Sequence, residues 1–197
     1  MIRARGLGRR FGDKRALHGV DVDLARGEFL LVTGPNGSGK TTLLRLFAGL
    51  IVPTVGELDV QTDRARVGFL SHDPLVYREL TPLENLNLYG RLYRIPERRE
   101  RIGMLLERFG LWDARAEQTG ELSRGMLQRL ALCRTLLHEP ELLLLDEPFS
   151  ALDASGADLV LDELGRHELP GRTIVVSSHQ PERLAERATT RLSLAKA

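Results

Sequence analysis

The 197-residue sequence predicts an α/β fold: a parallel sheet with flanking helices, an antiparallel β subdomain and an inserted α-helical subdomain. The parallel sheet is indicated by short apolar runs, because strands buried on both faces read as continuous apolar segments. These runs are EFLLVT (28–33), LLLLD (142–146) and TIVVSSH (173–179). We expect one domain over 1–197, in which about 1–72 and 141–197 form the core and about 73–140 form the helical subdomain.

Alternating apolar and polar residues predict the antiparallel portion near the N-terminus. This period of two is typical of a strand with one face on the core and one in water. The segments are DVDLARG (21–27), ELDV (57–60) and ARVGFL (65–70). The middle of the chain has helical periodicity instead, in runs at 83–93, 98–111 and 124–137.

The charge and composition of the chain argue against several classes of partner and of protein. The formal net charge of +1 gives no bulk attraction to nucleic acid, so we expect no nucleic-acid partner. The single cysteine, Cys133, cannot form an internal disulfide and fits a reducing compartment. The N-terminus lacks the apolar stretch of a secretion signal, and no apolar run approaches the roughly 20 residues of a membrane span. We therefore expect a soluble chain.

The segment GPNGSGKTT (34–42) follows an apolar run and precedes a helix-like pattern. It matches G-x-x-x-x-G-K-[ST], in which glycines let successive backbone N–H groups point at phosphate oxygens. A flexible glycine turn is the alternative, but the expected strand and helix on either side disfavour it. We predict that a nucleoside triphosphate binds at this loop, through Gly34, Pro35, Asn36, Gly37, Ser38, Gly39, Lys40, Thr41 and Thr42.

Two side chains of this loop have distinct expected roles. Lys40 neutralises the β- and γ-phosphates, and the Thr41 hydroxyl is a hard oxygen ligand for Mg²⁺. The helix that begins near Lys40 adds the positive end of its dipole. The sequence therefore predicts a P-loop NTPase core with a nucleoside triphosphate and Mg²⁺ as its ligands.

The segment LLLLDEP (142–148) predicts the second half of the site. Asp146 ends an apolar run and is expected to hold the metal, as the acidic residue of P-loop enzymes does. Glu147 follows it and is the expected general base for the attacking water. An acidic pair at a strand end is otherwise an ordinary solvated turn, but its combination with the phosphate loop favours a catalytic role.

The segment LSRGM begins a helical run just upstream of the acidic pair. Ser123 is a good N-cap, and Gly125 allows close backbone approach to an anion at a helix N-terminus. Alone it reads equally well as an ordinary capped helix. In this context it resembles the signature motif of ATP-binding cassette (ABC) ATPases, usually LSGGQ, at Leu122, Ser123, Arg124, Gly125 and Met126. Methionine at the last position removes a polar side-chain contact.

The resemblance extends from about residue 2 to about residue 194 and implies further roles. Phe11 matches the aromatic residue that stacks on adenine, and His179 matches the histidine that contacts the γ-phosphate. Asp153 matches the loop residue that contacts the opposite subunit. The family implies a head-to-tail homodimer, or a pair with a second ABC ATPase, in which each signature segment faces the other subunit's ATP. Transmembrane permease subunits would hold the chain peripherally at the cytoplasmic face of the inner membrane, as its only membrane contact.

His72 departs from the usual family pattern, which has a glutamine at this coupling position between the nucleotide and the membrane partner. An imidazole nitrogen is a softer ligand for Mg²⁺, and it cannot accept a hydrogen bond once protonated. The segment FLSHDPLVYRELTPLENL (69–86) resembles the ATPases of the haem exporter for cytochrome c maturation. Whether His72 would meet Mg²⁺ directly or through water stays open.

These patterns predict the ATP-hydrolysing subunit of a bacterial ABC exporter, with haem as the expected cargo. Another small exporter for drugs, lipids or polysaccharides is an alternative, as is a soluble ABC ATPase that acts on ribosomes or in iron–sulfur assembly. A catalytically dead module is a third, against which the intact Lys40, Asp146, Glu147 and His179 argue.

Overall fold

The computed structural model describes residues 1–166 and 171–196, so the remainder of the predicted 1–197 domain lies outside the described residues. The described chain forms two compact units. One contains 1–69, 141–147 and 171–196, and the other contains 70–140 and 148–166.

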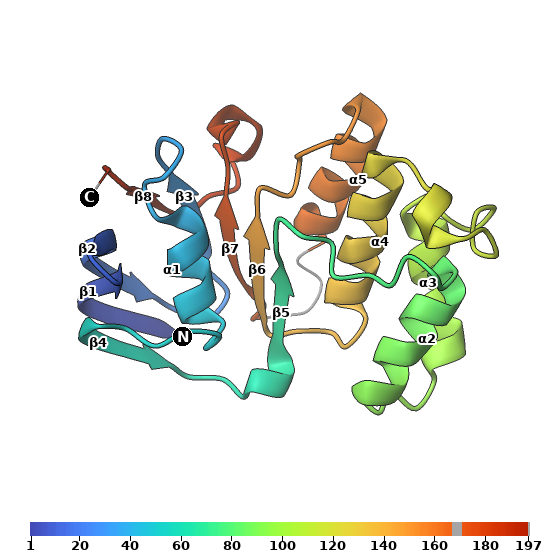
Figure 1. The fold of residues 1–197 in the computed structure, drawn as a ribbon, viewed down its shortest axis with the longest axis horizontal. Helices are drawn as coiled ribbons and strands as arrows, with labels where there is room; N and C mark the ends of the chain where they lie inside the picture. The colour runs from blue at the N-terminus through green and yellow to red at the C-terminus, as the bar shows by residue number, and fades with distance from the viewer. Residues whose placement is uncertain (167–170, 197) are drawn as a thin grey trace. The chain divides into compact units, whose positions relative to one another are not determined.

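A five-stranded sheet forms the centre of the first unit (Figure 1). Its order is β5-β6-β7-β3-β8, and β7 is parallel to both β6 and β3, as β3 is to β8. The strands are β3 (Phe29–Thr33), β5 (Val67–Leu70), β6 (Leu142–Asp146), β7 (Thr173–Ser177) and β8 (Thr190–Ser193). Every residue of β6 and β7 is buried, as expected of strands covered on both faces. The predicted fold class is confirmed.

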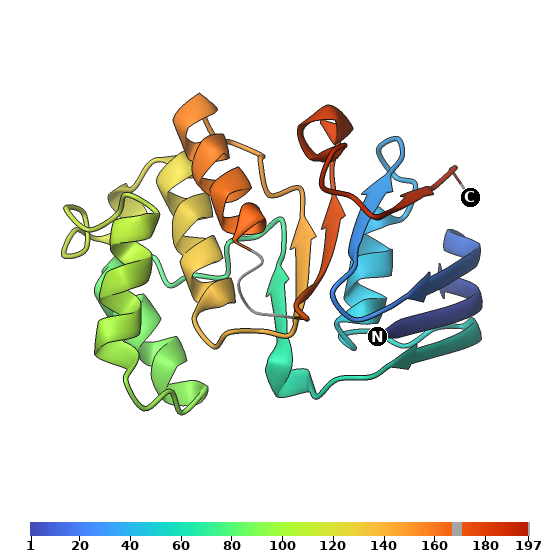
Figure 2. The same ribbon diagram turned by 180° about the vertical axis from the view of Figure 1, so that it is seen from behind.

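An antiparallel sheet of order β2-β1-β4 completes the β structure of this unit (Figure 2). Its strands are β1 (Ile2–Phe11), β2 (Lys14–Leu24) and β4 (Val55–Val60). The placement of 65–70 in the antiparallel portion was wrong, because β5 lies at the edge of the five-stranded sheet after the short helix η1 (Arg64–Arg66). Its partly buried and buried residues alternate, so it has the same sequence pattern as a half-exposed antiparallel strand.

Helix α1 (Lys40–Phe47) connects the two sheets of the first unit through one apolar core. Leu43 and Leu44 of the helix are fully buried in the same cluster as Leu7 of β1 and Leu30 of β3. The helix ends at Phe47, with Ala48 as its C-cap, because Gly49 has a left-handed backbone. A short helix, η3 (Pro181–Leu184), follows β7 in this unit.

The second unit contains the expected helices of the middle segment, α2 (Pro82–Leu92), α3 (Arg98–Arg108) and α4 (Arg124–Leu136), with the short helix η2 (Thr119–Glu121) before α4. A capping box at the start of α2 joins Thr81 and Glu84 in both directions. Cys133 of α4 is buried, and burial raises the pKa of its thiol. Within the described residues, no helix is long and apolar enough to cross a bilayer.

The fourth helix of this unit, α5 (Ala154–Gly165), was expected within the α/β core because it follows residue 141. It is grouped with the other helices instead. The Arg108 guanidinium donates to the Glu163 carboxylate at 2.9 Å, and Gln128 Nε2 lies 3.4 Å from the Pro148 carbonyl oxygen. These contacts join α3, α4 and the segment 148–166, which no local sequence pattern indicates.

Candidate functional site

The phosphate loop lies between β3 and α1, the strand and helix on which its prediction depended. Gly34, Gly37 and Gly39 all have positive φ, which glycine adopts without strain. A Cβ at Gly34 would collide with the backbone oxygen of Leu194, and one at Gly39 with that of Ala16. The loop is therefore held between β2 and the segment after β8, and its shape depends on glycine at these positions.

Lys40 begins α1, and its side chain is only 7% exposed. Its ammonium donates to the Gly34 carbonyl oxygen at 2.9 Å and reaches that of Pro35 at 3.5 Å. The same nitrogen lies 3.6 Å from Glu147 Oε1 and 3.4 Å from His179 Nε2. One cation thus lies within reach of both the phosphate loop and the expected catalytic groups.

Asp146 ends β6 with both carboxylate oxygens accepting hydrogen bonds. The Thr41 hydroxyl donates to Oδ2 at 2.7 Å, and the Ser177 hydroxyl donates to Oδ1 at 2.6 Å. Two hydroxyl donors on two oxygens fit an ionised carboxylate. Sequence reasoning missed Ser177. The signal that indicates it is its place at the end of a buried strand, level with Asp146 in the parallel register.

The Thr41 and Asp146 side chains also have the chemistry that a magnesium ion requires. Carboxylate and hydroxyl oxygens are hard ligands, and Mg²⁺ in NTPase sites takes the rest of its shell from phosphate and water. Among the described residues, no cluster of three or more histidine, cysteine or acidic side chains forms a separate metal site. The donor set fits a metal that is shared with a nucleotide rather than one enclosed by protein.

Glu147 has a left-handed backbone, with φ of 51°, which is strained for a residue with a side chain. Ser177 holds this conformation, because the Glu147 N–H donates to both its carbonyl and its hydroxyl oxygen at 3.1 Å. At the carboxylate, Oε2 accepts from the His179 N–H at 3.0 Å. Oε1 is buried and accepts no hydrogen bond from the described residues, although His179 Nε2 lies 3.2 Å away. Oε1 is thus the oxygen available to accept a proton.

His179 does not close its strand as expected, because β7 ends at Ser177 and the histidine lies two residues further on. Its ring is 45% exposed and is bounded on one side by Lys40 and Glu147. A strand end followed by a short turn places the ring beside the phosphate loop and leaves it accessible. The structure brings together three of the predicted catalytic residues within one compact unit: Lys40, Glu147 and His179.

Phe11 ends β1, with its ring 46% exposed. The Arg9 guanidinium carbon lies 4.7 Å from the ring centroid, so a cation covers part of the aromatic surface. An exposed aromatic ring is what the predicted stacking on adenine requires. The contact of the Arg9 guanidinium with the Phe11 ring was not predicted from the sequence, because the alternation of residues along a strand does not indicate which side chain will pack over a neighbouring ring.

The predicted residues His72, Leu122–Met126 and Asp153 belong to the second unit. Ser123 caps α4 by accepting from the Met126 N–H at 3.2 Å, while a Cβ at Gly125 would approach the Ala151 oxygen to 3.1 Å. Leu122 is buried, Arg124 is exposed and Met126 is half-buried, while His72 is exposed.

Asp153 caps α5 by accepting from the Gly156 N–H at 2.8 Å. This hydrogen bond, followed by one from the Ser155 hydroxyl, holds the pKa of the Asp153 carboxyl below its usual range. The carboxylate is thus ionised and exposed at the start of a helix. The geometry leaves it accessible for the expected contact with an opposite subunit.

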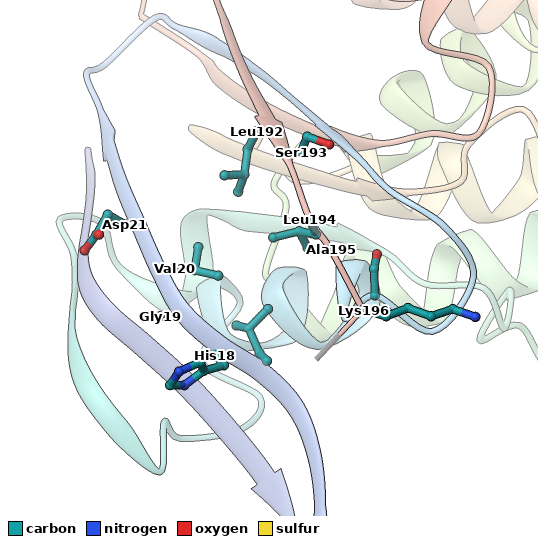
Figure 3. A pocket seen from close by; sticks show the side chains of 11 residues that line it. His18, Gly19, Val20, Asp21, Leu192, Ser193, Leu194, Ala195 and Lys196 are labelled. Carbon is teal, nitrogen blue, oxygen red and sulfur yellow. The ribbon is translucent and has the colours of Figure 1, made fainter.

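A pocket of about 330 Å³ lies beside the phosphate loop in the first unit (Figure 3). Residues His18 to Asp21 of β2 form one wall, and the segment from Leu192 to Lys196 forms another. Ser38 of the phosphate loop also lines it, with a buried hydroxyl that has no hydrogen-bond partner among the described residues. Of the predicted ATP-binding residues, Ser38 alone lines this pocket.

The chain is similar to proteins of one family over nearly its whole length. A model described as "ABC transporter" matches residues 17–150. The daunorubicin resistance ATP-binding protein DrrA3 of Streptomyces coeruleorubidus is 38% identical over 100% of this chain, which spans 65% of DrrA3. The aliphatic sulfonates import ATP-binding protein SsuB 1 of Nocardia farcinica is 42% identical, over 92% of this chain and 74% of its own length.

Solved structures agree with this relation. The dimeric post-hydrolysis state of the ATP-binding cassette MJ0796, bound to ADP and Pi, superposes with a TM-score of 0.87 at 28% identity. The match covers 98% of this chain and 94% of that cassette. The family model matches more than half of this chain, and the chain is 42% identical to SsuB 1 over 74% of that protein. Proteins that share only a fold do not need to be this similar in sequence. The chain belongs to the ABC transporter family, as an ATP-binding cassette ATPase domain.

Proposed function

We propose that this chain is the ATP-binding and ATP-hydrolysing subunit of a bacterial ABC exporter, which powers transport through nucleotide-driven dimerisation. The observation that carries the proposal is the convergence of Lys40, Glu147 and His179 next to the Thr41–Asp146 pair. A buried cation, an available carboxylate oxygen and an accessible imidazole at the end of a phosphate loop are the parts that γ-phosphate hydrolysis requires.

The phosphate loop would bind the β- and γ-phosphates through its backbone N–H groups and the N-terminus of α1. The Lys40 ammonium, now bonded to loop carbonyls, would donate to phosphate oxygens instead. Thr41 and Asp146 would hold Mg²⁺, which supplies charge neutralisation between the β- and γ-phosphate oxygens. The exposed ring of Phe11 would stack on the adenine.

Hydrolysis would begin with a water molecule held by Glu147 Oε1, the buried oxygen that accepts no hydrogen bond from the described residues. As the water oxygen bonds to the γ-phosphorus, its proton passes to Glu147 and the bond to the leaving ADP oxygen breaks. His179 and Lys40 would donate to the γ-phosphate oxygens, where negative charge is concentrated in the transition state. The products are ADP and inorganic phosphate.

Dimerisation would complete the site. In the proposed homodimer, or pair with a second ABC ATPase, the segment Leu122–Met126 at the start of α4 would contact the ATP of the opposite subunit. Its support is the exposed Ser123 cap, at the positive end of a 13-residue helix. Asp153 would contact the opposite subunit. ATP would hold the dimer closed, and hydrolysis would open it.

Transmembrane permease subunits are the proposed partners, and they would hold the chain at the cytoplasmic face of the inner membrane. Mild detergent extraction followed by affinity purification of the tagged chain tests this. Recovery of membrane subunits in stoichiometric amounts is expected. Recovery with ribosomes or soluble scaffold proteins alone would favour a non-transport ABC ATPase.

Haem export for cytochrome c biogenesis is the proposed transport function. It rests on His72 and on the resemblance of residues 69–86 to haem-exporter ATPases. The relatives named above bear names for drug resistance and sulfonate import, and an exporter of drugs, lipids or polysaccharides is the competing proposal. Cytochrome c maturation genes next to the reading frame would support haem, whereas drug-efflux or polysaccharide permease genes would contradict it.

The His72→Gln variant is expected to keep or raise ATP hydrolysis. Glutamine supplies a hard amide oxygen, whereas an imidazole nitrogen is a softer ligand for Mg²⁺. Steady-state turnover at a fixed pH measures the effect. A severe loss of turnover in His72→Gln would mean that the ring has a role that glutamine cannot fill.

A further inference from the structure

Asn85 is a fully buried polar side chain in the first turns of α2. Its Oδ1 accepts from the Tyr77 N–H at 2.8 Å, and its Nδ2 donates to the Tyr77 carbonyl oxygen at 2.9 Å. The same Nδ2 reaches the Thr81 carbonyl oxygen at 3.1 Å and that of Leu80 at 3.4 Å. The amide therefore fixes the backbone of the segment 77–81, which follows His72 in the chain.

Asn85 also contacts a second segment. Its Nδ2 lies 3.2 Å from the Thr119 hydroxyl oxygen, and Thr119 is fully buried as well. Two backbone hydrogen bonds support the link: the Thr119 N–H donates to Leu80 O at 3.0 Å, and the Gly120 N–H donates to Arg78 O at 2.9 Å. The residues after His72 and the residues before the signature segment are thus joined by one buried amide and by two direct backbone hydrogen bonds.

Thr119 lies just before the signature segment in the chain. Thr119 begins η2, which ends at Glu121, so Leu122 and the α4 cap Ser123 follow directly. On the other side, the Tyr89 hydroxyl donates to the Leu75 carbonyl oxygen at 2.7 Å, next to the strained backbone of Leu75. The segment from His72 to Tyr77 is therefore held to α2 at two points, and α2 is held to the start of the signature.

An amide suits this position because it combines donors with an acceptor. A carboxylate of the same shape would present an acceptor to four oxygens, and an apolar side chain would leave the Tyr77 N–H without its partner. A buried polar side chain destabilises the fold when some of its hydrogen bonds are missing. It makes its surroundings rigid when all of its hydrogen bonds are formed.

We propose that Asn85 is a positioning residue that, through Thr119, keeps the segment after His72 and the signature segment Leu122–Met126 in one fixed arrangement. The inference rests on the proposed function, because the arrangement affects ATP hydrolysis only where the signature contacts the ATP of an opposite subunit. Asn85 acts through the backbone, and the phosphate loop belongs to the other unit.

The test compares Thr119→Val, which removes the hydroxyl at nearly constant shape, with Thr119→Ser, which keeps it. Both are placed in a Glu147→Gln background so that bound ATP persists. In Thr119→Val, the protein concentration for half-dimerisation with ATP should rise about fivefold, corresponding to about 1 kcal/mol. ATP affinity of the monomer should stay unchanged, since its site lies in the other unit. Sedimentation velocity and fluorescent-nucleotide titration measure the two quantities.

If Thr119 had a merely structural role, Thr119→Val would lower the melting temperature. It would not weaken dimerisation while leaving the ATP affinity of the monomer unchanged. Amide hydrogen exchange provides a second readout: the N–H groups of Tyr77 and Gly120 should exchange faster in Thr119→Val than in Thr119→Ser. Equal dimerisation of the two variants, with faster exchange at these amides, overturns the inference. Asn85→Asp should show the same split as Thr119→Val, and it carries the test if Thr119→Val does not fold.

Failure of the parent proposal gives a different result. If the Glu147→Gln chain with native Thr119 does not dimerise when ATP is added, nucleotide-driven dimerisation is wrong for this chain. Dimerisation of that chain together with equal behaviour of the valine and serine variants instead rejects the role of Asn85 and Thr119 alone.

Discussion

The Glu147→Gln variant should bind ATP with near-native affinity and lose about 100- to 10,000-fold in turnover, the range that a positioned general base contributes. The amide retains the shape of the side chain and the backbone hydrogen bonds to Ser177, so the strained turn is preserved. What it loses is the basicity of Oε1, the oxygen left to accept a proton from water. This variant should therefore keep its affinity for ATP while it loses most of its rate of ATP hydrolysis.

Single-turnover and steady-state phosphate release, with ATP affinity measured in parallel, test this expectation. Glu57→Gln is the matched control, because Glu57 is an exposed glutamate of β4 within the same unit. Its turnover should equal that of the native chain. Equal turnover in Glu147→Gln and the native chain would remove Glu147 from the mechanism and leave its strained backbone without a catalytic explanation.

The Lys40→Met variant should lose at least about 10- to 100-fold in ATP affinity. A charge-assisted hydrogen bond is worth about 1.5–3 kcal/mol, and each 1.4 kcal/mol corresponds to a tenfold change in affinity. Methionine keeps much of the length of the side chain within a site where lysine is only 7% exposed, so packing is largely retained. The carbonyl oxygen of Gly34 loses its donor in the empty loop, which should lower the melting temperature modestly.

The chain offers a matched control for this change as well. Lys14 is an exposed lysine of β2, and Lys14→Met should leave ATP affinity unchanged. Titration calorimetry at fixed ionic strength measures both variants, because phosphate binding by lysine is sensitive to salt. Native affinity in Lys40→Met would mean that the backbone N–H groups and α1 alone account for binding.

The phosphate loop could be predicted from the sequence because its chemistry depends on residues close together in the chain. Spacing alone places Gly34, Lys40 and Thr41 on one turn and one helix start. The strands β6 and β7 were equally accessible to prediction, since burial on both faces leaves a continuous apolar run.

The contacts that were missed depend on register between distant segments. Ser177 meets Asp146 because β6 and β7 pair in parallel, and no local pattern specifies that alignment. An ion pair between Arg108 and Glu163 joins α5 to α3, and charged residues of this kind also occur on ordinary solvated helix faces. The placement of β5 failed for a related reason, because alternating burial along a strand does not indicate which sheet the strand joins.

The contact between Gly34 and the backbone of Leu194 has a practical meaning for anyone who cuts or fuses this chain. Leu194 also donates its N–H to the Thr33 carbonyl oxygen at 2.9 Å. The segment after β8 therefore supports the phosphate loop, which lies much earlier in the chain. A split-protein reporter or a shortened expression fragment that omits β8 and the residues after it would remove one wall of the pocket beside the phosphate loop while leaving the GPNGSGKTT motif intact. Reading frames that contain GPNGSGKTT but lack this last strand are therefore poor choices for nucleotide-binding assays.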